Sequence, residues 1–269
     1  MSWFRRWFVF IVLAGLVVTP AAAQRRTVRI APVAFGAPAG TAPAGPTSAN
    51  DPFGRVLPSG RIVHPQGTSV VVGMNALGVA LTPDGRYAIV SNDDERETSV
   101  HSALDPAVTG GYSLAVVDTQ TMRVVSRYQA PNETFFIGLA ALRDPANSGN
   151  TLVLASGGGS NVVYAFDLDA GGRLAPDAQH QIAIPTPSDA HLANVQRAFP
   201  STLVLSPDGT RAFVVNELGN SVAQIDTATR RVVGSEPSVG FFPLGTALTP
   251  QGLLVANEGL MRYAFLDAP

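Results

Sequence analysis

A segment that recurs along the chain constrains the fold more than any other feature of the sequence. Each copy opens with an apolar run that ends in Pro-Asp-Gly or a close variant, and a second apolar run follows it. The opening run occupies residues 77–85, 201–209 and 244–252. Pro207 and Pro250, at the same place in two consecutive copies, are 43 residues apart, which is the length of a repeat built from four short strands.

The rest of each copy has the same character. A third apolar run ends in aspartate, at residues 112–118, 161–167, 221–226 and 261–267. Fourth runs follow at 123–128 and 231–234, and a weaker copy of the first two runs lies at 137–142 and 151–156. Val, Ile, Leu and Phe alternate with small or polar residues in these runs, which is typical of short β-strands. Proline, aspartate and glycine between them favour tight turns.

We therefore predict an all-β protein, a β-propeller in which four-stranded blades are arranged radially. About four blades are expected, near residues 77–130, 136–185, 200–240 and 243–269. The last of them lacks a fourth strand, which leaves two arrangements open. Either residues 60–72 complete this blade and close a small four-bladed ring, or the chain is a partial arc of a larger propeller. The end of the chain soon after Asp267 favours the arc.

The N-terminal region has the composition of an export signal followed by a linker. Arg5 and Arg6 precede an apolar run of about 12 residues, shorter than the roughly 20 that span a bilayer. Small residues at 21–23 suit a signal peptidase, so we predict a signal peptide at 1–23, with an uncleaved anchor as the alternative. An Ala/Pro/Gly-rich linker is expected at 24–54, ahead of propeller repeats at 55–269. The protein should be periplasmic or secreted, with no membrane span once the signal is removed.

Composition excludes several kinds of chemistry. All 18 basic residues are arginine, so neither a Schiff base on lysine nor a Walker-type phosphate loop can form. There is no cysteine, which excludes disulfides, thiolate zinc sites and a cysteine nucleophile. A formal net charge of −2 disfavours binding through nucleic-acid phosphates. We expect no nucleic-acid partner.

An asparagine followed by an acid ends the second strand of three copies. The pairs are Asn92-Asp93, Asn216-Glu217 and Asn257-Glu258. Equivalent positions of a propeller lie at the same height, so these groups should recur around one rim. One interpretation is that the side chain of each asparagine hydrogen-bonds the backbone of the adjacent turn and stabilises it. The other is that the rim presents amides and carboxylates to a polar or cationic ligand, and we name these six residues as candidate ligand-binding residues.

No catalytic set can be assigned from the sequence. The histidines form no metal-binding or triad motif, and we expect them to be solvated loop residues; they are His64, His101, His180 and His191. The alternative is that His191 with Asp189, or His101 with Asp105, lines a binding surface. His180 falls in a variable connection that we expect between residues 170 and 199. We predict no metal and no cofactor, calcium being the one ion that carboxylates on a rim would suit.

The repeat unit resembles a known family. Leu-Ser-Pro-Asp-Gly at 205–209, Val-Val-Asn at 214–216 and Asn-Ser-Val at 220–222 are similar to the YVTN-type β-propeller repeat. Residues 202–240 match it best, and the resemblance covers roughly 60–269. The resemblance implies a propeller fold and does not specify a function.

A second resemblance concerns residues 155–167, Ala-Ser-Gly-Gly-Gly-Ser-Asn-Val-Val-Tyr-Ala-Phe-Asp. This stretch is similar to a blade of the propeller that precedes an alkaline-phosphatase-type phosphoesterase domain in larger exported bacterial proteins. The chain matches the propeller portion only. The metal ligands and nucleophile of the phosphoesterase have no counterpart in it, so that activity does not carry over.

These features together predict an exported propeller that acts as a binding or interaction module without catalytic activity. Its partner is an unknown protein or a polar small molecule, and the chain is expected to be the N-terminal part of a larger protein. The alternative is a propeller-type hydrolase, a lactonase or a phosphoesterase-like enzyme, with a polar or metal site at one rim. That alternative needs carboxylates and histidines that converge, and the asparagine–acid pairs have no matching histidine.

Overall fold

The computed structural model describes residues 45–48, 51–56, 62–63, 67–73, 75–93, 111–186, 197–233 and 239–259. These residues are almost entirely strands and turns, and their helical content is one short 3-10 turn, η2 (Gly158–Ser160). The chain divides into two compact units, Met1–His64 and Pro65–Pro269. No helix among the described residues is long and apolar enough to cross a membrane. The predicted signal peptide at 1–23 lies outside them.

The first unit contains a small antiparallel sheet with the order β1-β2-β3. Its strands are β1 (Gly45–Ser48), β2 (Asp51–Val56) and β3 (Ile62–Val63). Strand β1 and the first part of β2 fall within residues 24–54, for which the sequence predicts a linker. Of residues 60–72, Ile62 and Val63 form β3, which pairs with β2, and the described residues from 67 on form no strand.

The second unit contains successive antiparallel sheets, which we call blades 1 to 4. Blade 1 consists of β4 (Ala76–Leu81), β5 (Tyr87–Asn92), β6 (Ser113–Asp118) and β7 (Arg123–Tyr128). Blade 2 consists of β8 (Leu139–Arg143), β9 (Thr151–Ser156), β10 (Val162–Leu168) and β11 (Leu174–Ala183). Blade 3 consists of β12 (Pro200–Leu205), β13 (Arg211–Asn216), β14 (Ser221–Asp226) and β15 (Arg231–Val232). The described part of blade 4 is β16 (Pro243–Thr249) and β17 (Gly252–Asn257).

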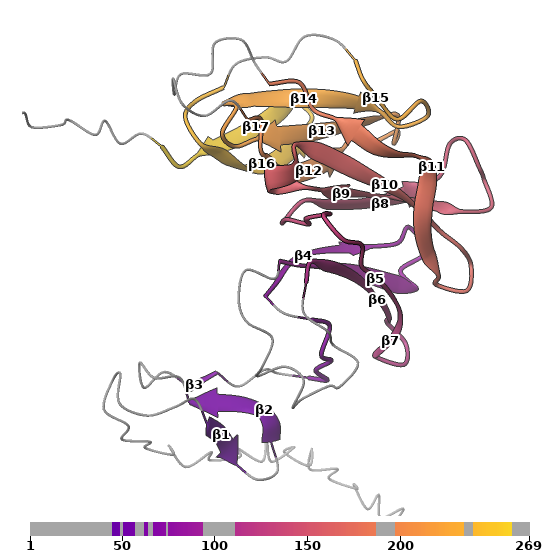
Figure 1. Ribbon diagram of the computed structural model, residues 1–269, viewed down its shortest axis with the longest axis vertical. Helices are drawn as coiled ribbons and strands as arrows, with labels where there is room; N and C mark the ends of the chain where they lie inside the picture. Colours follow the sequence, from indigo (N-terminus) through magenta and orange to yellow (C-terminus); the bar gives the residue numbers. More distant parts are fainter. Residues whose placement is uncertain are drawn as a thin grey trace, which may run out of the picture. The chain divides into compact units, whose positions relative to one another are not determined.

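The blades follow one another radially (Figure 1). The first strand of each blade contacts the first strand of the next, in the order β4, β8, β12 and β16. The last strands β7, β11 and β15 also contact one another in order. Within blades 1 to 3 the strands pair strictly in chain order, as up-and-down meanders. This is the arrangement of β-propeller blades, and the predicted fold class is confirmed.

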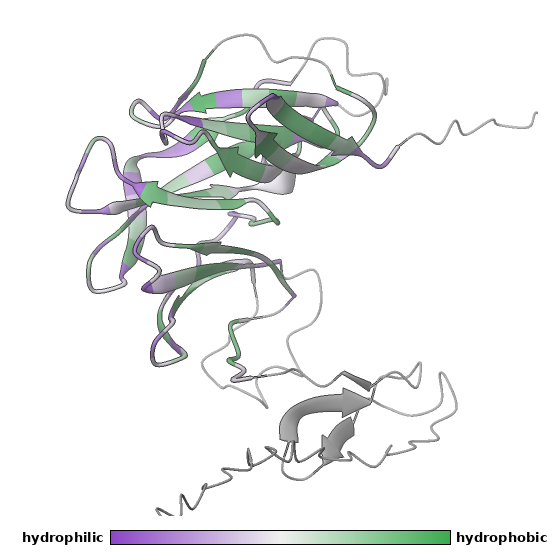
Figure 2. Cartoon of the chain, turned by 180° about the vertical axis from the view of Figure 1, so that it is seen from behind, coloured by the Kyte–Doolittle hydropathy of each residue, from purple (hydrophilic) through white to green (hydrophobic). Residues whose placement is uncertain are grey.

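The core lies between the blades, on both faces of blade 2. In β9, Leu152 and Leu154 join a cluster shared with blade 3, whereas Val153 and Ala155 join a cluster shared with blade 1. Because successive side chains of a strand point to opposite faces, a sheet covered on both sides needs apolar residues at every position. This explains why β9, TLVLAS, and β10, VVYAFDL, carry apolar residues at nearly every position. Figure 2 shows the strands of the blades as mostly hydrophobic and the turns as hydrophilic.

Strand β11 lies within the connection predicted at 170–199, which is a correction to the sequence analysis. Its sequence, LAPDAQHQIA, does not alternate cleanly. The register against β10 shifts between Tyr164, which pairs with Gln181, and Phe166, which pairs with Pro176. The extra residues form a bulge that breaks the period of two. His180 belongs to this strand.

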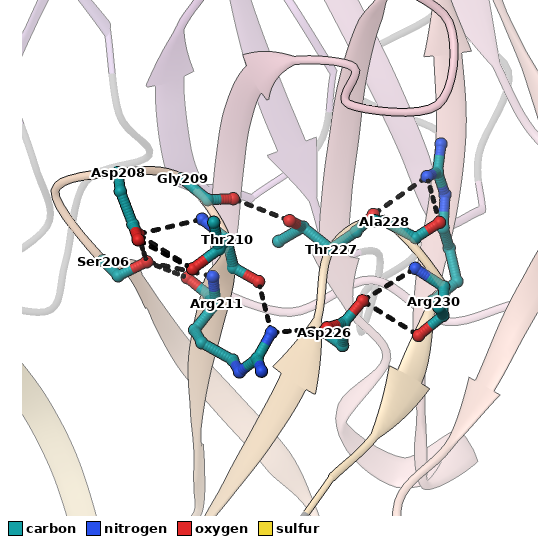
Figure 3. A network of polar contacts seen from close by, with 10 residues as sticks. Ser206, Asp208, Gly209, Thr210, Arg211, Asp226, Thr227, Ala228 and Arg230 are labelled. Carbon is teal, nitrogen blue, oxygen red and sulfur yellow. Dashed lines mark hydrogen bonds and ion pairs between the residues drawn. The ribbon is translucent and has the colours of Figure 1, made fainter.

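Aspartates accept hydrogen bonds in the turns that join the first strand of a blade to the second and the third strand to the fourth. Figure 3 shows these turns for blade 3. Ser206 Oγ donates a hydrogen bond to Asp208 Oδ1 at 2.6 Å, and the backbone N–H of Thr210 donates to the same oxygen at 3.1 Å. In the next turn the N–H of Thr229 donates to Asp226 Oδ1 at 2.8 Å. Blade 1 makes the same contacts around Asp84 and Asp118, and blade 4 has Gln251 in place of the first aspartate. The repeated turn aspartates therefore stabilise the backbone of the turns in which they lie.

These contacts predict a pH-dependent contribution to stability. The hydroxyl of Ser206, followed by Thr210, lowers the pKa of Asp208 from 3.8 to about 2. A carboxyl whose pKa is lower in the folded state stabilises the fold above the unfolded pKa and loses that contribution as pH falls through the folded pKa. We expect the difference in unfolding midpoint between the wild type and Asp208→Asn to be greatest above about pH 5. It should disappear near pH 2.

Thermal unfolding of both proteins between pH 2 and 6 measures this effect, and Ser206→Ala is the matched control. Since the Ser206 hydroxyl is the largest cause of the shift, Ser206→Ala should flatten the pH dependence without removing the carboxylate. Parallel pH profiles for wild type and Asp208→Asn would contradict the prediction.

Candidate functional site

The three asparagine–acid pairs lie at equivalent places in blades 1, 3 and 4. Each asparagine is the last residue of the second strand, with Asn92 in β5, Asn216 in β13 and Asn257 in β17. The backbone N–H of each following acid donates to the carbonyl of the residue just before the first strand of its blade. These bonds join Asp93 to Asn75 at 3.2 Å, Glu217 to Phe199 at 3.0 Å and Glu258 to Phe242 at 2.9 Å. The three acids therefore recur on one rim, which we call the acidic rim.

The asparagine side chains of blades 1 and 3 are buried, and each hydrogen-bonds a serine of its own blade. Asn92 Nδ2 donates to Ser113 Oγ at 3.2 Å and to the carbonyl of Val72 at 3.2 Å. Asn216 Nδ2 donates to Ser221 Oγ at 3.0 Å. Both amides hold the first residue of the third strand, which is the structural role considered above. Asn257 is exposed.

The acids of blades 3 and 4 are electrostatically coupled. Burial raises the pKa of Glu217, and the carboxylate of Glu258 raises it further. Glu217 Oε2 is buried, and no hydrogen bond reaches it within the described part of the chain. Glu258 is exposed. Like charges at short range oppose each other's ionisation, so this part of the rim favours a cation.

A second polar cluster lies between blades 2 and 3, and none of the sequence motifs described above predicted it. Oxygens of Asp144, Asp167 and Asp177 lie within 4.8 Å of one another. They line a cavity of about 190 Å³ together with Arg230. The guanidinium Nη2 of Arg230 contacts Asp144 Oδ1 at 2.7 Å and Asp177 Oδ2 at 3.1 Å. Three oxygen donors of this kind suit a hard cation, but the guanidinium already neutralises one negative charge between two of them.

Asp167 reaches this cluster because the turn of blade 2 is built differently. Asp118 and Asp226 end the third strands of blades 1 and 3 and cap their own turns. In blade 2 that role moves to Asp169, whose Oδ1 accepts the backbone N–H groups of Gly171 and Arg173, both at 2.9 Å. Asp167 instead faces the cavity, where burial raises its pKa and Asp177 adds to the effect. The missing Asp-Thr-x-Thr turn after Asp167 is the sequence signal that could have identified it.

His180 is not a solvated loop residue, and that prediction was wrong. Its ring is part-buried on β11, where Nε2 lies 3.0 Å from Glu133 Oε1 and Nδ1 lies 2.8 Å from the carbonyl of Ala165. The ring also packs edge-on against Phe166, with centroids 4.7 Å apart. Both ring nitrogens lie beside oxygen atoms, so the ring links the side chain of Glu133 to the backbone of β10. The pair joins blade 2 to the segment that leads into it.

The other histidines, His64, His101 and His191, lie outside the described residues. His180, the histidine that the structure describes, contacts Glu133 and not the acids of the rim. Among the described residues, no histidine accompanies Glu217 and Glu258.

Comparisons with known proteins identify no family for this chain. No protein-family model and no curated protein matches the chain. Solved structures that resemble it include a functionally unknown protein from Desulfotomaculum acetoxidans, with 19% identity, a TM-score of 0.48 and coverage of 74% of this chain and 53% of that one. The virginiamycin B lyase of Staphylococcus aureus has 12% identity, a TM-score of 0.44 and coverage of 76% and 55%. The β-propeller domain of Cps50 (Swd1) from Myceliophteria thermophila has 12% identity, a TM-score of 0.42 and coverage of 68% and 49%. The chain spans about half the length of these structures.

Proposed function

We propose that this chain is a non-catalytic propeller module of an exported protein and that its acidic rim binds a cationic group. The observation that supports this most is the pair Glu217 and Glu258, two carboxylates on adjacent blades. Burial raises the pKa of Glu217, and the charge of Glu258 raises it further. The exposed amide of Asn257 lies on the same rim. The cationic group is an ammonium or guanidinium of a partner, or a calcium ion.

The physical reason is electrostatic. Two neighbouring carboxylates repel each other, and one of them is partly removed from water, so the uncomplexed rim is destabilised at neutral pH. A bound cation removes the repulsion and supplies the partner that Glu217 Oε2 lacks among the described residues. A bound cation therefore offsets both the burial and the repulsion that raise the pKa of Glu217.

The alternative function is hydrolysis of a lactone or phosphoester at the rim. It needs a general base or a metal-bound water beside these acids. The acid cluster between blades 2 and 3 offers carboxylates, but Arg230 engages two of its three aspartates. These contacts favour a binding role over catalysis.

Isothermal titration of the purified protein with calcium chloride, and separately with hexa-arginine, tests the proposal and distinguishes the two sources of cation. The double variant Glu217→Gln/Glu258→Gln should weaken the binding of the preferred probe at least about tenfold, the effect of losing roughly 1.4 kcal/mol. Asp84→Asn is the matched control, because it removes one charge at the ends of the strands that lie away from the acidic rim. Its affinity for the probe should stay within about twofold of the wild-type affinity. Failure of both probes to bind, or equal losses in the control and the double variant, would overturn the proposal.

A further inference from the structure

Each blade has two apolar faces, one toward the blade before it and one toward the blade after it. We call these the preceding face and the following face. In blade 2, Leu139 and Ala141 of β8 point to the preceding face and pack against the cluster shared with blade 1. In blade 3, Leu203 and Leu205 of β12 do the same against the cluster shared with blade 2. Equivalent side chains are thus covered wherever a preceding blade is present.

The preceding face of blade 1 carries exposed apolar side chains among the described residues. Val79 and Leu81 of β4 pair with Val90 and Ala88 of β5, as Leu203 and Leu205 pair with Val214 and Ala212 in blade 3. They therefore occupy the same positions, yet Val79 is 68% exposed and Leu81 is 59% exposed. Large apolar side chains adjacent on one sheet face and open to water indicate an interaction surface.

The described part of blade 4 carries exposed apolar side chains on its following face as well. Leu254 of β17 pairs with Ala247 and occupies the position that Ile89 has in blade 1 and Leu154 has in blade 2. Ile89 and Leu154 are 0% exposed because the next blade covers them, whereas Leu254 is 61% exposed. Ala247 and Ala256 on the same face are exposed too.

We propose that the occupant of both faces is a second copy of this chain. The preceding face of blade 1 and the following face of blade 4 are the two halves of one blade–blade interface, the interface that already joins blades 1 to 2 and 2 to 3 through the two apolar clusters. Within one chain both halves are exposed at the same time, so they do not cover each other. A second copy supplies both missing halves at once.

The symmetry of this pairing is head to tail. Blade 4 of one copy packs on blade 1 of its partner, and blade 4 of the partner packs on blade 1 of the first copy. The two heterologous contacts close a ring with a twofold axis. Such a ring would hold about eight blades, within the range of four to eight that propellers adopt. The acidic rim is not part of these faces, so this inference stands apart from the proposed function.

Sedimentation velocity of the purified protein, with variants on each face, tests the pairing. The wild type should sediment as a dimer. Val79→Arg alters the preceding face of blade 1, and Leu254→Glu alters the following face of blade 4. A single charge in an apolar interface is costly to desolvate, so each variant should weaken dimerisation at least about 100-fold. Val125→Arg, at a 46% exposed position on the last strand of blade 1, is the matched control and should remain dimeric.

Mixing the two variants distinguishes head-to-tail pairing from other dimers. A mixed ring has one wild-type interface and one in which the introduced arginine faces the introduced glutamate, so an equimolar mixture should regain dimers that neither variant forms alone. Circular dichroism confirms that each variant is folded, since both positions are exposed in the single chain. A monomeric wild type would overturn the proposal. So would a dimer that only one of the two variants disrupts, or a mixture that stays monomeric.

Discussion

Replacing Arg230 with methionine is expected to lower the free energy of unfolding by about 3–5 kcal/mol, the range observed when one partner of a buried ion pair is removed. Arg230 is 6% exposed and Asp144 is 3% exposed. The guanidinium also donates from Nη1 to the carbonyls of Thr227 and Ala228, at 2.8 and 3.0 Å. Its loss leaves the carboxylate of Asp144 buried without its cation, and Asp177 loses the same partner.

Urea unfolding at pH 7 measures this effect, and Arg211→Met is the matched control. Arg211 forms an ion pair with Asp226, but its side chain is 38% exposed. Exposed ion pairs contribute about 0–1 kcal/mol, so the control should be much less destabilised. Equal losses for the two variants would contradict a buried role for Arg230.

The effect of Arg230→Met should also depend on pH. Burial and Asp177 raise the pKa of Asp167, so this carboxyl favours the folded state below its unfolded pKa and loses that contribution as pH rises through its folded pKa. Arg230 lowers the pKa of Asp167, so without the guanidinium the ionisation of Asp167 is opposed more strongly. The difference between wild type and variant should therefore shrink as pH falls below about 5. Adding Asp144→Asn to Arg230→Met should recover part of the loss, because the uncompensated charge is removed.

The repeat predicted the blades because each blade is a local structure. The four-stranded meander, the Pro-Asp-Gly turn and the strand that ends in Asn216 are all encoded within about 43 consecutive residues. The turn aspartates act on backbone groups two or three residues away. Such contacts follow directly from the order of the residues.

The acid cluster could not be predicted in this way, because it joins residues that are distant in the chain. Arg230 and Asp144 are 86 positions apart, and their contact depends on how blade 3 packs on blade 2. The position of His180 depends on a bulge in β11 that conceals the strand. For the acidic rim, the repeat predicted that Glu217 and Glu258 occupy equivalent positions, but not the electrostatic coupling between them or the partial burial of Glu217.

Truncation of Phe166 should have an effect as large as the loss of Arg230. The ring is fully buried in the cluster shared by blades 1 and 2. Its centroid lies 4.8 Å from that of Tyr128 on blade 1 and 4.7 Å from that of His180 on β11. Phe166→Ala should lower the free energy of unfolding by about 3–5 kcal/mol, through lost apolar burial and the cavity that remains. Phe241→Ala, at a position that is 46% exposed, is the matched control and should cost less than about 1 kcal/mol.

Hydrogen exchange tells whether the loss is global or confined to blade 1. Blade 1 contacts a neighbouring blade through one apolar cluster, whereas blade 2 belongs to both clusters. Weakening the cluster around Phe166 should therefore let β4–β7 open before the rest of the propeller, since contiguous parts of a fold open as cooperative units. Protection should fall first in β5 and β6 and persist in β13 and β14. An equal loss of protection in β5, β6, β13 and β14 would show that the blades unfold as one unit.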